Sequence, residues 1–168
     1  MSEEITSALI PLRDRTLLVP GSAVAEISVW RRIRMVPDQP PWLLGVAQWR
    51  RGALPVLDLE ALMDPRRAPV DRGRCLVVLN RSRPDPAPPF LGLAAIGLPR
   101  LVRVAADDLH AYRVESSPWL LGRAVLGMDE VQFPDLAELE SQILRLGPAV
   151  STGIRHGGPA SSGGVAGP

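Results

Sequence analysis

At 168 residues, the chain is long enough for one domain with a sizeable core. Apolar residues make up 46% of it, but they occur in short runs interrupted by 18 prolines and 15 glycines, which favours β-structure with many turns. The formal net charge of +1 excludes a strong electrostatic attraction of the whole chain to nucleic acid or to anionic membranes.

The single cysteine and the N-terminal residues bear on the compartment. Cys75 lies in an apolar run, where we expect a buried thiol, and one cysteine can form neither an internal disulfide nor a metal cluster. The first five residues carry acids where a signal peptide would carry positive charge, and no apolar run approaches about 18 residues. We therefore expect a cytoplasmic protein that does not insert into a membrane.

The first predicted elements are short. Residues 9–12 and 16–19 are β-type runs that predict a hairpin or a bent strand pair. Ser22 is a suitable N-cap, so residues 23–27 are expected to form a helical turn. Residues 29–36 alternate Arg with apolar side chains, as a half-exposed strand would.

The stretch 45–59 predicts the central hairpin. Residues 46–49 and 53–57 form its strands, and the connection 50–52 supplies Gly52 for the positive φ of a tight turn. Proline donates no hydrogen bond to a β-ladder, so Pro55 predicts a strand at an edge or beside a bulge, with backbone acceptors open to a partner. A short helical segment follows the hairpin and ends before Pro65.

The second half predicts more strands and one helix. Residues 64–74 read as a polar linker at which the chain passes from one β unit to another, because new strands begin at Cys75. The strand-like runs are residues 75–79, 90–96, 101–104, 120–126 and 130–133. Residues 107–118 are too polar to assign. From Leu136 the apolar residues recur at spacings of three and four, which predicts a terminal helix with one face on the core.

Residues 148–168 are mostly Gly, Ser, Ala and Pro. Such a segment has little apolar surface to offset the entropy lost on ordering, so we expect a disordered tail after a domain formed by residues 1–147. His156 in this tail has no chemical neighbours in sequence.

Catalysis has little support in the sequence. Asp107, Asp108 and His110 could supply a base and an orienting acid, but a polar turn after a strand commonly contains such residues. The chain shows no nucleophile elbow, no metal-ligand spacing and no phosphate-cradling glycine loop. We therefore expect no catalytic residues, no metal and no cofactor.

A nucleic-acid surface is the alternative interpretation. The residues that favour it are Arg31, Arg32, Arg34, Arg50 and Arg51, with Trp30, Trp42 and Trp49 close in sequence. Glu26, Asp38 and Asp58 dilute this positive charge, and a near-neutral chain gains little affinity from phosphate contacts. The remaining hypothesis is a module that binds other proteins.

Several motifs resemble the first half of a CheW-like domain. They are Val24-Ala-Glu-Ile27, Trp42-Leu-Leu-Gly-Val46, Arg50 and Pro55-Val-Leu-Asp-Leu59. The family has Arg-Gly at the turn, whereas this chain has Arg50-Arg51 with Gly52 one place later. The likeness is good over residues 16–63 and loose beyond. That loose second half and the Pro-Asp-Leu136 ending resemble the divergent ChpC type of pilus chemosensory systems.

The resemblance implies an all-β fold of two five-stranded, SH3-like β-barrels over a shared core, with short helices and a C-terminal helix. It implies a non-enzymatic adaptor between a methyl-accepting chemoreceptor and the regulatory domain of a CheA-type histidine kinase, in chemotaxis or in twitching motility driven by type IV pili. The resemblance also implies that the protein is recruited to receptor arrays at the inner membrane. The implied protein-binding residues are Glu26, Gly45, Val46, Trp49, Arg50, Pro55, Val56 and Asp58. A bidentate Glu26–Arg50 pair is expected to hold the hairpin.

Overall fold

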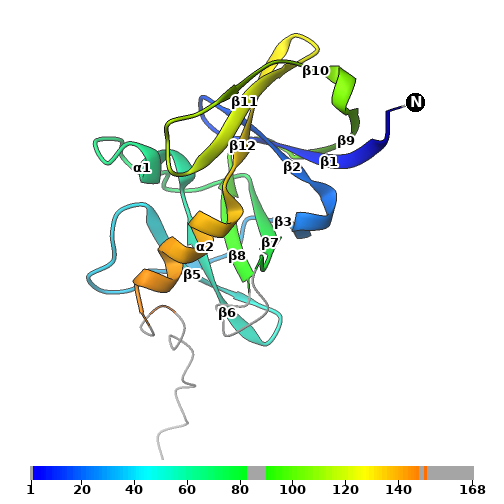
Figure 1. Ribbon diagram of the computed structural model, residues 1–168. Helices are drawn as coiled ribbons and strands as arrows, with labels where there is room; N and C mark the ends of the chain where they lie inside the picture. Colours follow the sequence, from blue (N-terminus) through cyan, green and yellow to red (C-terminus); the bar gives the residue numbers. More distant parts are fainter. Residues whose placement is uncertain (1, 83–89, 148–149, 151–168) are drawn as a thin grey trace, which may run out of the picture.

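The computed structural model describes residues 2–82, 90–147 and 150. Within them the chain forms twelve strands in two six-stranded sheets, with two α-helices and two 3₁₀ turns (Figure 1). The expected mainly β fold is therefore confirmed. Each sheet has six strands, where the resemblance implied five.

The first sheet is built from both ends of the described chain and is called the terminal sheet. Its strands are β1 (Glu4–Pro11), β2 (Thr16–Pro20), β9 (Arg100–Ala105), β10 (Leu109–Val114), β11 (Leu120–Leu126) and β12 (Asp129–Pro134). Their order is β10-β11-β12-β2-β1-β9, and all neighbours are antiparallel except β12 and β2. The predicted pairing of β1 with β2 is confirmed, and the strand-like runs 120–126 and 130–133 are the antiparallel strands β11 and β12.

The second sheet comes from the middle of the chain and is called the central sheet. Its strands are β3 (Val24–Val29), β4 (Ile33–Arg34), β5 (Leu43–Trp49), β6 (Gly52–Leu57), β7 (Cys75–Asn80) and β8 (Phe90–Ala95). Their order is β3-β7-β8-β6-β5-β4. Residues 64–74 thus connect elements of one sheet, and the prediction that they divide two β units is wrong. The chain changes sheets between β2 and β3 and between β8 and β9.

Both helices begin at an aspartate. Asp58 accepts hydrogen bonds from the amides of Glu60 and Ala61 and starts α1 (Leu59–Met63). Asp135 does the same through the amide of Glu138 for α2 (Leu136–Arg145), whose apolar side lies on the core, as its spacing predicted. In Figure 1, α2 continues from the end of β12 and passes in front of the central sheet.

Two local predictions fail because strand pairing overrides local preference, and one unassigned stretch proves to be a strand. The helical turn expected at 23–27 is instead β3, whose β-branched residues pair antiparallel with β7, and only Gly21–Ala23 forms a 3₁₀ turn. The long strand expected at 29–36 shortens to the two residues of β4. The unassigned stretch 107–118 contains β10, the edge strand paired with β11.

Pro55 does not mark an edge, because β6 lies between β8 and β5. The pairing of β6 with β8 begins at Val56, one residue after Pro55. On the other side the register with β5 shifts between Leu43 and Gly45, so the expected irregularity is present although the edge is not.

The main core lies between the sheets and receives side chains from both. Ala8, Ile10 and Leu17 of the terminal sheet meet Val77 and Leu93 of the central sheet there, and α2 adds two buried side chains. Cys75 is buried in the same core, as expected. Each sheet also covers a smaller apolar cluster on its other face, since strand residues alternate between faces.

An ion cluster ties the β1–β2 turn to the end of the central sheet. The guanidinium of Arg13 donates to Oδ2 of Asp58 (2.9 Å), Oε2 of Glu60 (3.2 Å) and the carbonyl of Ala68 (2.8 Å). Glu60 also accepts from the backbone amides of Arg13 and Asp14. The two carboxylate side chains are only 6% and 2% exposed, so Arg13 neutralises charges that water barely reaches.

Val150 lies beyond the expected end of the domain, yet it is only 4% exposed and packs in the main core. We predict that Val150→Ala lowers the free energy of unfolding by about 1–2 kcal/mol, because each buried CH₂ contributes about 0.8 kcal/mol.

Removal of residues 154–168, which lie outside the described residues, should leave the melting temperature unchanged. Calorimetry on the Val150→Ala variant and on the truncated protein measures both stabilities. A marked drop after the truncation would show that the tail contributes to stability.

Candidate functional site

Two of the residues predicted to bind partners, Glu26 and Arg50, meet at Trp49, at the end of β5. Its Nε1–H donates to Oε2 of Glu26 on β3 (2.9 Å), and Oε1 of Glu26 accepts from Arg31 (3.2 Å). The guanidinium carbon of Arg50 lies 4.1 Å from a Trp49 ring centroid, and the ring of Phe90 meets Trp49 edge-on at 4.5 Å. We call these five residues the Trp49 cluster.

Curvature of the central sheet brings this cluster together. β3 is one edge of the sheet, and three strands separate it from β5, yet Glu26 reaches the Trp49 indole. The sheet therefore curls strongly enough for side chains from distant strands to touch. The enclosed apolar cluster lies inside this curl and contains Ala47, Trp49, Leu54, Val56, Leu76 and Val78.

The expected Glu26–Arg50 pair is not formed, so that prediction is wrong. Arg31 pairs with Glu26 instead, and Arg50 stacks on the aromatic ring between them. Trp49 thus connects the two predicted residues, with its indole N–H on one and its ring face on the other. Arg31 and Phe90 are the partners that sequence reasoning missed. Phe90 carries no local signal, because strand pairing and sheet curvature bring it to Trp49. Arg31 lies five residues from Glu26 and pairs with it directly.

The backbone of the turn also differs from expectation. Trp49 pairs with Gly52, so the connection is the two residues Arg50 and Arg51. Arg50 has φ of 50°, and Gly52 is not among the residues with positive φ. Arg50 therefore takes the left-handed conformation that was assigned to Gly52. A non-glycine residue there costs about 1–2 kcal/mol, which the stacking on Trp49 partly offsets.

Most of the other predicted residues are buried. Val46, Pro55 and Val56 lie in or beside the cores, and Asp58 caps α1 inside the Arg13 ion cluster. Gly45 allows β4 to approach β5, as a Cβ there would lie 2.3 Å from the carbonyl oxygen of Arg34. Among the eight residues predicted to bind partners, only Glu26 and Arg50 therefore present charged side chains to solvent.

A groove lies beside the cluster and was not predicted. It has a volume of about 650 Å³ and runs between residues 30–44 and 69–72. Arg31 belongs to both features, because it pairs with Glu26 and lines the groove. Trp30 and Arg32 had been considered only as parts of a nucleic-acid surface.

The candidates for acid–base chemistry do not form a catalytic centre. Asp107 accepts a hydrogen bond from Ser2, Asp108 accepts from the amide of Ala105, and His110 is exposed on β10. A hydrogen bond from Arg66 lowers the pKa of Asp64, but this pair lies on an exposed turn. Among the described residues, no group of His, Cys, Asp and Glu is arranged to hold a metal ion. In the same part of the chain, no helix has the length and apolar character needed to cross a bilayer.

The fold and the site define a mainly β protein with a rigidly supported surface cluster. Residues 7–142 match the family described as the CheW-like domain. The chain therefore belongs to the CheW-like family, a family of scaffold and adaptor proteins that are generally not enzymes.

The structure is also similar to a solved one, the scaffolding protein TtCheW from Thermoanaerobacter tengcongensis. The TM-score is 0.66 at 14% sequence identity, and the match covers 83% of this chain and 92% of that chain. No curated protein matches the chain in sequence.

Proposed function

We propose that this protein is a chemosensory adaptor that couples a methyl-accepting chemoreceptor to the regulatory domain of a CheA-type histidine kinase. The observation that carries the proposal is the family match over residues 7–142. The output is either swimming or twitching driven by type IV pili. The loosely matching second half of the sequence favours the pilus system.

We propose that the exposed side of the Trp49 cluster contacts the kinase. Trp49 is only 4% exposed and holds Arg50 over its ring, which fixes the position of an exposed guanidinium. A fixed guanidinium loses less conformational entropy on binding a carboxylate than a mobile one does. Val56 packs with Trp49 in the small apolar cluster and supports this surface from below. Gly45, Val46, Pro55 and Asp58 maintain the fold of the central sheet rather than touching the partner.

We predict that Arg50→Glu weakens binding of the kinase regulatory domain by about tenfold or more, because it reverses a charge held at one position. The fold should change little, since an exposed charge in a high dielectric contributes about 0–1 kcal/mol. Isothermal titration calorimetry with the purified kinase domain measures the affinity, and circular dichroism measures the melting temperature.

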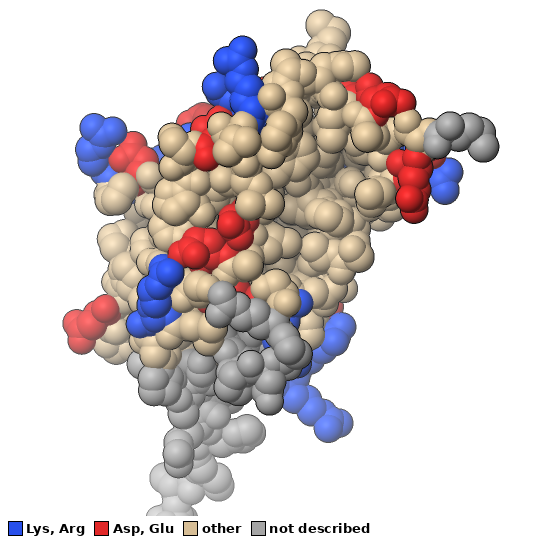
Figure 2. All heavy atoms as spheres, viewed as in Figure 1, with Lys and Arg blue, Asp and Glu red and all other residues tan. Residues whose placement is uncertain are grey.

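Arg100→Glu is the matched control, because it makes the same charge change on an exposed residue of the terminal sheet. Equal affinities for the two variants would refute the role of Arg50. Recovery of RNA in place of a kinase or receptor from a pull-down would favour the nucleic-acid alternative. Figure 2 argues against that outcome for the face it shows, where basic and acidic side chains are scattered rather than gathered in one basic patch.

A further inference from the structure

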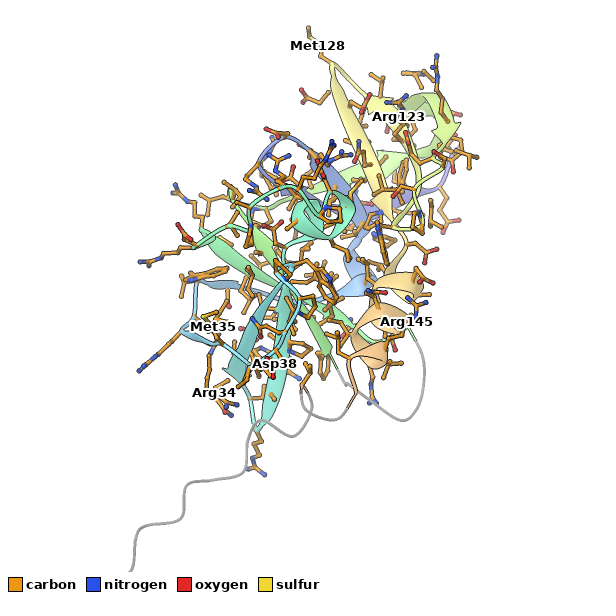
Figure 3. The ribbon with its side chains drawn as sticks, turned by 90° about the vertical axis from the view of Figure 1, so that its left-hand side faces the viewer. Arg34, Met35, Asp38, Arg123, Met128 and Arg145 are labelled. Atoms are coloured by element: carbon orange, nitrogen blue, oxygen red, sulfur yellow. The ribbon has the colours of Figure 1, made fainter. Side chains whose placement is uncertain are left out.

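The groove beside the Trp49 cluster has apolar walls. Trp30, Ile33 and Leu44 are partly buried against the small apolar cluster of the central sheet and also line the groove. Pro40, Pro41 and Pro69 add further apolar surface. Met35 lines it too, with 76% of its surface exposed. In Figure 3, Met35 lies on the same side of the molecule as Arg34. An exposed, flexible thioether is suited to covering an apolar side chain of a ligand.

The walls are preformed rather than loose. Gln39 accepts from the amide of Val36 (2.8 Å) and donates to the carbonyl of Leu43 (2.6 Å), which holds the loop before β5. Trp30 lies against Gly73 so closely that a Cβ there would be 2.5 Å from the indole ring. A ligand therefore meets walls that are already in place, which lowers the entropic cost of binding.

The charges that line the groove are mainly positive. Its ionisable residues are Arg31, Arg32, Arg72 and one acid, Asp71. Glu26 neutralises Arg31, whereas Arg32 and Arg72 are exposed and form no ion pair with any described residue. Two uncompensated guanidinium groups beside an apolar floor complement carboxylates next to an apolar side chain.

We propose that this groove binds an acidic peptide segment of a partner protein, with one large apolar side chain on the floor and carboxylates on Arg32 and Arg72. A volume of about 650 Å³ suits a ligand of a few residues. Asp71 and the apolar walls disfavour a phosphate backbone, while Asp71 can still accept from peptide amides. The proposal does not depend on the kinase assignment, because its test uses a synthetic peptide.

The test measures binding of a fluorescein-labelled Glu-Glu-Leu-Trp-Glu-Glu peptide by fluorescence anisotropy. Arg32→Glu combined with Arg72→Glu should weaken binding by about a hundredfold, about tenfold for each lost charge-assisted contact. Arg51→Glu combined with Arg100→Glu makes the same change in net charge outside the groove and should leave the affinity within about twofold. Met35→Ala should weaken binding several-fold, and the peptide should shift the Met35 methyl resonance in NMR spectra.

Two results would overturn the proposal. One is equal loss of affinity in the groove variant and in its charge-matched control, which would reduce the effect to net charge. The other is tighter binding of a single-stranded oligonucleotide than of the peptide, with the same dependence on Arg32 and Arg72, which would make the groove a phosphate site. A Lys-Lys-Leu-Trp-Lys-Lys peptide should not bind. All variants should keep the melting temperature of the unmodified protein, because the substituted side chains are exposed.

Discussion

Arg13→Met should lower the free energy of unfolding by about 3–5 kcal/mol, the cost typical of removing one partner from a buried ion pair. The substitution keeps the apolar stem but leaves Asp58 and Glu60 facing each other's charge in a site that water barely reaches. It also removes the hydrogen bond to the carbonyl of Ala68. Urea denaturation measures the change, and the melting temperature should fall by roughly 10 °C.

The matched control is Arg67→Met. Arg67 pairs with Asp14 at the same corner of the molecule, but that carboxylate is largely exposed, so the expected cost is about 0–1 kcal/mol. Adding Glu60→Gln to Arg13→Met should recover part of the loss, since it removes one of the uncompensated charges. If the Arg13 and Arg67 variants were equally stable, the ion cluster would not hold the terminal and central sheets together.

Gly45→Ala should be the most damaging substitution of a glycine in the central sheet. Gly45 has φ of 134°, and a Cβ would lie 2.3 Å from the carbonyl oxygen of Arg34 and 2.8 Å from Cγ2 of Ile33. Backbone strain of about 1–3 kcal/mol and an overpacking cost of about 1–3 kcal/mol act together. Because β4 must move away from β5, the groove should also change shape. Urea denaturation measures the loss, and peptide anisotropy reports on the groove.

Gly52→Ala is the control in the same hairpin. A Cβ at Gly52 would meet nothing within 4 Å, and its φ is not positive. Alanine should therefore leave stability unchanged or raise it by about 0.4–1 kcal/mol, by reducing the entropy of the unfolded chain. If Gly52→Ala were instead as harmful as Gly45→Ala, the turn would need a glycine at residue 52, as the sequence pattern alone suggested.

Local patterns predicted the elements whose causes are local. The spacing of apolar residues predicted α2, and the short segment between the hairpin and Pro65 predicted α1. Alternating or continuous apolar runs bounded by Gly and Pro predicted β5 and β6, along with β7, β11 and β12. Where a local signal competed with long-range pairing, the prediction failed. Ser22 resembles an N-cap, but β3 follows because its residues pair with β7.

The candidate site shows the same division. Its residue types and its hairpin were evident in the sequence, and so was the likeness to the CheW-like family. The partners were not, because Glu26 and Trp49 are 23 residues apart and meet only after the sheet curls. The pairing of Glu26 with Arg31 in place of Arg50 depends on where each side chain can reach.

The sequence by itself determined the mainly β class, both α-helices, most strands and the family, because these depend on periodicity, turn residues and short motifs. Only the tertiary structure decided which strands share a sheet, which predicted residues are buried, and where the groove lies. The central sheet joins strands on both sides of residues 64–74, and the terminal sheet pairs β1 with β9 and β2 with β12, whose partner residues lie 91 to 115 positions apart in sequence. Such contacts arise from packing between distant segments, and no local pattern encodes them.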